Sequence, residues 1–197
     1  MIIRIGFFRG LNVGGKNKVS MVDLKSIFQE MNFQTLKTIG NTGVILFDYA
    51  ESNFTDATIA KIVSAKAHVP ASFLSISYDE LADLLQNAPS WWNENKDWRH
   101  NAIFLLENYS GEQLLSDLPP LDGNIEKVSL LNNTLLWSSA FVDRKLYYKS
   151  QYRKLLKHEA YPLMTIRNAN TLTKTYQAAT KLLSAEKKLA NEPAENE

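Results

Sequence analysis

The residues that most clearly suggest chemistry form a loop near the N-terminus, RGLNVGGKNK, at residues 9–18. Gly10, Gly15 and Lys16 match the spacing of a Walker A loop, G-x-x-x-x-G-K-[ST], whose backbone amides and lysine hold nucleotide phosphates. The last position of that motif is Asn17 here, and asparagine lacks the hydroxyl that would hold magnesium. The loop therefore matches the motif except at its metal-binding position.

The surrounding sequence argues against a P-loop fold. The link GNTG at residues 40–43 is a tight turn, so VILFDY must run antiparallel to the strand before it, whereas a P-loop fold needs parallel strands and long crossovers. Ser20 is a good N-cap and starts the next helix beyond Lys16, so the loop amides do not lead directly into a helix N-terminus. The loop is then either a structural glycine turn or a looser anion-binding loop. An anion-binding loop would use backbone amides together with Arg9, Lys16 and Lys18.

A second polar motif, TIRNANTLTK at residues 165–174, surrounds an expected helix start. The free amides and positive dipole of a helix N-terminus attract anions, and Arg167 can add a two-pronged hydrogen bond to phosphate or carboxylate. The alternative is that these side chains only cap the helix and pin it to the neighbouring lobe. If the loop and this motif share one cleft, the ligand-binding residues are Arg9, Asn12, Gly14, Gly15, Lys16, Asn17, Lys18, Arg167, Asn168, Asn170, Thr171 and Lys174.

A third motif, DRKLYYKSQYRKLLKHE, predicts a basic helix over residues 144–157 with Tyr148 and Tyr152 beside its charged stripe. Basic residues interleaved with aromatic ones suit phosphate backbones and stacked bases. The alternative is an amphipathic helix whose basic face is simply solvated. The aromatic strand signature of the RRM fold is absent. The stripe recurs every four residues at Lys145, Lys149, Arg153 and Lys157.

Catalytic signatures are weak. The sequence has no serine elbow, no HExxH motif and no metal-ligand spacing among its histidines, so we expect no metal or cofactor. An enzyme acting on a phosphorylated or nucleotide substrate stays open, with Asp23 and Asp48 as the candidate acids. A tryptophan cluster could wall an apolar pocket or hold two lobes together, and it comprises Trp91, Trp92 and Trp98.

The bulk composition indicates a globular cytosolic protein. The 197 residues are 45% hydrophobic and 22% charged, enough for one large domain or two small ones. There is no cysteine, which fits a reducing compartment, and no apolar run approaches the roughly 20 residues that span a bilayer. The net charge of +1 names no partner, but basic regions at residues 1–25 and 141–181 bracket an acidic middle. They would form a positive patch if the fold brought them together.

Hydrophobic periodicity predicts an α+β fold of two related lobes. In the first half, strands at residues 2–8, 35–39, 44–49 and 72–78 and two helices follow the order β-α-β-β-α-β, which is the ferredoxin-like unit. The second half approximates the same order, with a hairpin turn at Asn132 and Asn133. The expected division is a ferredoxin-like lobe at 1–78, a short helix and Trp-rich connection at 79–100, a second α+β lobe at 101–184 and a polar tail at 185–197.

Three segments together carry a family resemblance: RGLNVGGKNKVSM, GNTGVILF and TIRNANTLTK. They resemble the bacterial "domain of unknown function" family sixteen-ninety-seven, whose members open with RG-[IL]-NVGG-x-N-x-[VL]-x-M and close with T-x-RN-x-NT-x-x-K. The middle motif of that family usually reads SGNVVF, and Ile39 stands here in place of its serine. The resemblance implies two ferredoxin-like lobes and a cytosolic location, and it supplies no catalytic residues.

Three classes of function follow from these motifs. The leading expectation is binding of a phosphorylated small ligand in a basic cleft between the lobes. The alternative is RNA or DNA binding along the basic stripe, with affinity that falls steeply with salt. The third is the enzyme described above. No membrane partner is expected.

Overall fold

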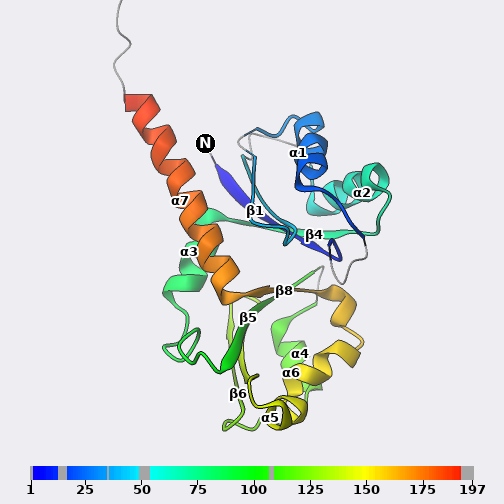
Figure 1. Ribbon diagram of the computed structural model, residues 1–197, viewed down its shortest axis with the longest axis vertical. Helices are drawn as coiled ribbons and strands as arrows, with labels where there is room; N and C mark the ends of the chain where they lie inside the picture. Colours follow the sequence, from blue (N-terminus) through cyan, green and yellow to red (C-terminus); the bar gives the residue numbers. More distant parts are fainter. Residues whose placement is uncertain (1, 13–16, 35, 49–53, 107–108, 192–197) are drawn as a thin grey trace, which may run out of the picture. The chain divides into compact units, whose positions relative to one another are not determined.

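The computed structural model describes residues 2–12, 17–34, 36–48, 54–106 and 109–191 (Figure 1). The chain divides into two compact units, one of Met1–Ala82 with Thr173–Glu197 and one of Asp83–Leu172. This division differs from the expected lobe boundaries, because the end of the last helix groups with the first unit. None of the described helices is both long and apolar enough to cross a membrane.

The first unit contains the predicted β-α-β-β-α-β order. Its elements are β1 (Ile3–Arg9), α1 (Met21–Glu30), β2 (Lys37–Thr38), β3 (Val44–Asp48), α2 (Asp56–Ala67) and β4 (Ser72–Ser77). The strands form an antiparallel sheet in the order β2-β3-β1-β4, as the turn at residues 40–43 required. Ser20 caps α1 as predicted, since its hydroxyl accepts from the amide of Asp23, and Thr55 caps α2 in the same way.

Aromatic side chains fill the core between this sheet and its helices. Phe8, Phe28, Phe33, Phe47 and Phe73 are each at most 4% exposed, and their contacting rings lie 4.5–6.2 Å apart. Ring pairs at this spacing add directional attraction to the burial of apolar area. The core fixes α1 and α2 on one face of the sheet.

The second unit repeats the strand order of the first. Its elements are β5 (Trp98–Leu105), α4 (Gly111–Asp117), β6 (Glu126–Leu131), β7 (Thr134–Ala140), α5 (Arg144–Lys149), α6 (Gln151–Lys154), two 3₁₀ turns η1 (Leu155–Lys157) and η2 (Tyr161–Leu163), and β8 (Met164–Asn168). The sheet order β6-β7-β5-β8 equals second-third-first-fourth, which is also the order in the first unit. Asn132 and Asn133 both have positive φ, as expected for the hairpin turn between β6 and β7.

Two further helices cross the boundary between the units. α3 (Tyr78–Gln86) begins in the first unit and ends in the second, and α7 (Ala169–Asn191) does the reverse. The ring of Tyr78 stacks on that of Tyr176 at 5.3 Å, which ties α3 to α7 inside the first unit. The expectation of a frayed tail from residue 185 is wrong as far as residue 191, because the segment AEKKLAN consists mostly of good helix formers.

Candidate functional site

The N-terminal loop is held closed by its own asparagines. The side chain of Asn12 donates to the carbonyl of Val19 and accepts from its amide, both at 2.9 Å. The side chain of Asn17 donates to the carbonyl of Gly10 at 3.0 Å, and the amide of Asn12 donates to the carbonyl of Asn17. Gly10, Asn12 and Asn17 all have positive φ, which glycine and asparagine tolerate best. The two asparagines therefore maintain the loop, while the predicted ligand residues Gly14, Gly15 and Lys16 lie outside the described part of the chain.

The C-terminal motif places its polar side chains at the junction of β8 and α7. The side chain of Asn168 accepts from the amide of Asn170 and donates to the carbonyl of His100, so it caps α7 and ties it to β5. Arg167 is half-buried, its Nη1 donates to the carbonyl of Ile166 at 2.8 Å, and burial lowers the pKa of its guanidinium to about 10. Lys174 is exposed on α7. These contacts agree with the capping alternative.

The two end motifs are divided differently between the units. Arg9 to Lys18 lie in the first unit, whereas the motif passes at Leu172 from the second unit into the first. A cleft shared by the two motifs therefore stays a prediction.

The predicted basic helix is wrong as a single element. Ser150 has extended backbone angles, with φ −66° and ψ 146°, and it ends α5 and begins α6. Its buried hydroxyl donates to the carbonyl of Tyr147 at 2.8 Å and accepts from the amide of Arg153 at 3.3 Å. A serine that makes such local bonds competes with the helical pattern and favours a break. The four stripe residues are consequently divided among α5 (Lys145 and Lys149), α6 (Arg153) and η1 (Lys157).

Around this break, arginine and aromatic side chains form a continuous series of contacts. Arg99 lies 3.7 Å over the ring of Phe141 and Arg144 lies 5.2 Å from the same ring. The ring of Phe141 meets Tyr147 edge-on at 5.5 Å. We call this set the basic–aromatic cluster, and its members are Arg99, Phe141, Arg144, Tyr147, Tyr148 and Arg153.

The cluster presents charge and one exposed ring to solvent. The ring centroids of Tyr147 and Tyr148 lie 5.8 Å apart, and the guanidinium carbon of Arg153 lies 5.8 Å from the centroid of the Tyr148 ring. Tyr148 is nevertheless 62% exposed. The segment from residue 144 to 157 contains six lysines and arginines and no acid. Sequence reasoning missed Arg99 and Phe141, because nothing local marks a strand residue and a loop residue as neighbours.

A buried carboxylate anchors the start of α6. Glu126 is 1% exposed, and its oxygens accept from the amide of Gln151 at 2.8 Å, the amide of Tyr152 at 3.1 Å and the indole of Trp137 at 3.1 Å. Tyr152 in turn accepts from the side chain of Asn101 at 2.8 Å, and burial raises its pKa. The negative charge therefore faces the amino end of α6 and fixes where that helix begins.

The tryptophan cluster has structural contacts. Trp92 is buried and Trp98 lies in β5, so the Trp-rich connection ends earlier than expected. The buried ring of His100 holds the preceding segment, because its Nδ1 accepts from the amide of Asn93 at 3.0 Å and its Nε2 lies 2.7 Å from the carbonyl of Asn95. Trp137, in β7, is fully buried.

The candidate acids have separate surroundings. The carboxylate of Asp48 accepts from the amide of Gln34 at 2.6 Å, which closes the connection before β2. Asp23 is exposed in the first turn of α1, and no ion pair joins it to another described side chain. Within the described ranges, no group of three or more histidines and acids could hold a metal ion.

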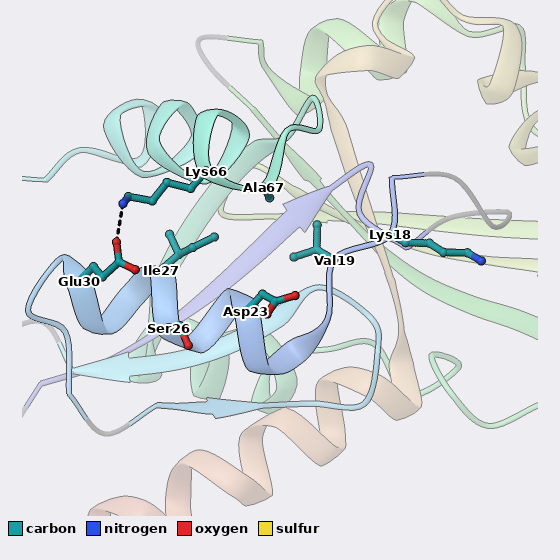
Figure 2. Close-up of a pocket in the computed structure, with 8 residues that line it drawn as sticks. All are labelled: Lys18, Val19, Asp23, Ser26, Ile27, Glu30, Lys66 and Ala67. Atoms are coloured by element: carbon teal, nitrogen blue, oxygen red, sulfur yellow. Dashed lines mark hydrogen bonds and ion pairs between the residues drawn. The ribbon is translucent and has the colours of Figure 1, made fainter.

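Two surface cavities lie on either side of α1 in the first unit. One, of about 460 Å³, is lined by Lys18 and Asp23 and by the ion pair between Lys66 and Glu30 (Figure 2). The other, of about 590 Å³, has Lys25 as its single charged lining residue. Of the predicted ligand residues, Lys18 lines the first of these two cavities.

Comparison with known proteins gives a family and a fold but no activity. No protein of curated function matches the sequence. Among solved structures, the conserved bacterial protein SP0830 from Streptococcus pneumoniae is similar, with 28% identity and a TM-score of 0.72 over 89% of this chain and 97% of that one. The family model "Protein of unknown function (DUF1697)" matches residues 1–135, which include the loop at residues 9–18 and the GNTG turn. The chain belongs to this family.

Proposed function

We propose that this protein binds single-stranded nucleic acid through the basic–aromatic cluster of the second unit. The observation that supports this most directly is the series of arginine–ring contacts that ends at the exposed ring of Tyr148. A stacked base gains roughly 1–3 kcal/mol on an aromatic ring, and neighbouring lysines and arginines attract the backbone phosphates.

The geometry also favours a single strand over a duplex. The basic residues of 144–157 lie on two short helices and a 3₁₀ turn, with a break at Ser150, so this segment offers no long helix that could enter a major groove. An exposed ring can stack only on a base that is already unpaired. The cluster would then bind with weak sequence preference, because every base offers a π-face.

Fluorescence anisotropy with labelled oligothymidylate and oligouridylate, measured over a salt series, tests the proposal. Affinity should fall linearly with the logarithm of the salt concentration, with a slope of about −0.7 for each phosphate neutralised on a single strand. Replacing Lys145 and Lys149 together by glutamine should reduce the magnitude of that slope by about 1.4. Tyr148→Ala should weaken binding by about 1–3 kcal/mol with little change in slope.

Matched control variants separate the cluster from general charge. Lys25→Gln and Lys61→Gln remove exposed or partly exposed cations from α1 and α2 in the first unit, and they should leave affinity and slope unchanged. Equal losses in the control and cluster variants would refute the assignment to this surface. Full affinity in Tyr148→Ala would refute the stacking role.

A second candidate is the leading expectation from the sequence, a phosphorylated small ligand at the N-terminal loop. The feature that favours it is the pair of asparagine contacts that fix both ends of the loop beside the exposed Lys18. A ligand present at about 100 times its dissociation constant raises the free energy of unfolding by about 2.7 kcal/mol, so a thermal-shift panel of nucleotides and sugar phosphates would detect it. A shift that disappears in both Arg9→Ala and Arg167→Ala would support the shared cleft, and a shift that survives both would refute it.

A further inference from the structure

Strand β6 forms one edge of the second sheet. It pairs with β7 on one side, and no other strand of the described ranges bonds to it. In an antiparallel pair, successive residues bond alternately toward the partner strand and away from it. The amide of Ala140, next to β7, donates to the carbonyl of Ile125 at 2.8 Å, so the odd-numbered residues of β6 bond to β7. The even-numbered residues, among them Val128 and Leu130, therefore turn their backbone N–H and C=O groups outward.

The outward groups at the centre of β6 are open. The backbone N–H and C=O of Val128 and Leu130 bond to no residue of the described ranges. Both side chains are half-buried against the core that includes Leu114 of α4, and Lys127 between β7 and the edge is exposed. A row of unpaired backbone groups is a template for another strand. The six residues of β6 contain no proline and keep a continuous register with β7, so the template is unbroken.

The other edges of the two sheets are short or occupied by side chains. β2 is only two residues long. On β4, the amide of Ser75 donates to the carboxylate of Asp56 at 2.7 Å, and the carbonyl of Ser75 accepts from Arg4 at 2.8 Å. On β8, the carbonyl of Ile166 accepts from the side chain of Arg167. β6 differs from these edges, because no described side chain occupies the outward groups at its centre.

We infer that β6 pairs with β6 of a second copy of this chain, antiparallel and about a two-fold axis at Ser129. Val128 of each copy then lies opposite Leu130 of the other, and the two copies exchange about four backbone hydrogen bonds. An axis perpendicular to the sheet keeps the face that packs on α4 on the same side in both copies. The half-buried side chains of Val128 and Leu130 therefore meet across the axis and extend each other's apolar surface.

The sequence of β6 is complementary to itself in this register. Lys127 lies opposite Leu131 of the second copy, and the two copies of Lys127 are about 13 Å apart, beyond the roughly 8 Å at which salt screens exposed charges. Ser129 faces its own copy at the axis, where two hydroxyl groups can bond. The carboxylate of Glu126 is buried and bonded within its own chain, so it brings no charge to the edge. No like charges therefore meet across the axis.

The dimer would be weak and reversible. One strand pair buries less than the roughly 1,200 Å² of a standard stable interface. None of the residues on this edge belongs to the basic–aromatic cluster, so the dimer and the proposed function can fail separately.

Sedimentation equilibrium on the full chain, from about 10 µM to 1 mM, measures the association. The mass should rise from 22.4 kDa toward twice that value as the concentration increases. In NMR spectra over the same series, the amide signals of Val128 and Leu130 should move with concentration. The amide signals of β2 and β4 should stay in place, because those edges take no part.

Charge substitutions at the axis locate the interface. Ser129→Glu should weaken association about tenfold or more, because two carboxylates then face each other. Ser129→Lys should weaken it in the same way, whereas an equimolar mixture of the two variants should associate at least as tightly as the parent protein. The matched control is Ser72→Glu, at an exposed position on the edge strand β4, and it should associate as the parent does.

Three results would overturn the inference. The first is a mass that stays at 22.4 kDa up to about 1 mM, even if β6 binds an added peptide strand. The second is a Ser129→Glu variant that associates as tightly as the parent, which would assign the dimer to another surface. The third is a mixture of the two charge variants that stays as weak as either alone. The parent measurements need no variant, so they decide the matter even where a variant fails to fold.

Discussion

Replacement of Glu126 by alanine should be among the most damaging single changes in the second unit. The carboxylate is buried and accepts three hydrogen bonds, from the amides of Gln151 and Tyr152 and from the indole of Trp137. Each buried donor left without an acceptor costs roughly 1–3 kcal/mol. Small movements of α6 and entry of water would recover part of that cost, so we expect Glu126→Ala to lower the free energy of unfolding of this unit by about 3–5 kcal/mol.

Glu126→Gln is the informative companion variant. It retains one oxygen, which can still accept from the amide of Tyr152 and the indole of Trp137, but its NH2 group then faces the backbone N–H of Gln151, so that two donors meet and that N–H loses its acceptor. We expect a smaller loss of about 1–3 kcal/mol. Glu112→Ala, at an exposed position on α4, should stay within about 0.5 kcal/mol of the parent protein.

Native-state hydrogen exchange is the appropriate assay, because two units can unfold in separate steps and a single melting temperature would mix them. Amides of β6, β7 and α6 should lose about a hundredfold or more of their protection in Glu126→Ala, since 1.4 kcal/mol corresponds to a factor of ten. Amides of β1 and β3 report the first unit. A loss below about 1 kcal/mol, or equal losses in the alanine and glutamine variants, would refute the anchoring role of the carboxylate.

Three further predictions test other parts of the fold. Gly6→Ala should destabilise the first unit by about 1–3 kcal/mol in urea unfolding, because the added Cβ would overlap the ring of Phe73. The control Gly123→Ala, whose Cβ would have nothing within 4 Å, should be nearly neutral. Asn12→Ala should cost about 2 kcal/mol by the same measurement, since it removes both bonds to Val19 at a residue with φ of 55°. Burial and the hydrogen bond to Asp117 raise the pKa of Tyr109 to about 12. The contribution of this hydroxyl to stability is therefore complete below about pH 10 and is lost as the pH rises toward 12. Phenolate absorbance should show a late-titrating tyrosine that Tyr109→Phe removes.

The fold was predictable where a local signal and the long-range arrangement agree. Ser20 before a run of helical periodicity predicted the start of α1, and its hydroxyl makes the expected cap. The turn at residues 40–43 predicted the antiparallel pairing of β2 and β3, which the structure contains. Such signals need only neighbouring residues, so the sequence contains them in full.

The basic segment shows why other features could not be predicted. Its helical spacing continues through Ser150 without interruption, and the break depends on a hydrogen bond to Tyr147 and on the carboxylate of Glu126, which pairs with the next turn. Likewise, Arg99 and Phe141 become neighbours only through the packing of the second unit. Periodicity cannot report the contacts of Glu126 and Arg99, because these join residues far apart in the chain.

The repeated strand order allows the two units to be compared position by position. In the first unit the second crossover is the unbroken helix α2, which packs on an aromatic core. In the second unit the same crossover is divided into α5, α6 and η1, and the sheet beneath it carries the buried Glu126 and Asn101. A buried charge is costly to keep, and here it starts α6 at a point that leaves Tyr148 exposed at the end of the preceding helix.

The family match ends at residue 135, before Phe141 and the crossover, so the cluster has to be tested in this chain directly. If Glu126→Gln leaves the second unit folded but weakens oligonucleotide binding as much as Tyr148→Ala does, the buried charge serves to position the surface; unchanged binding would restrict Glu126 to stability.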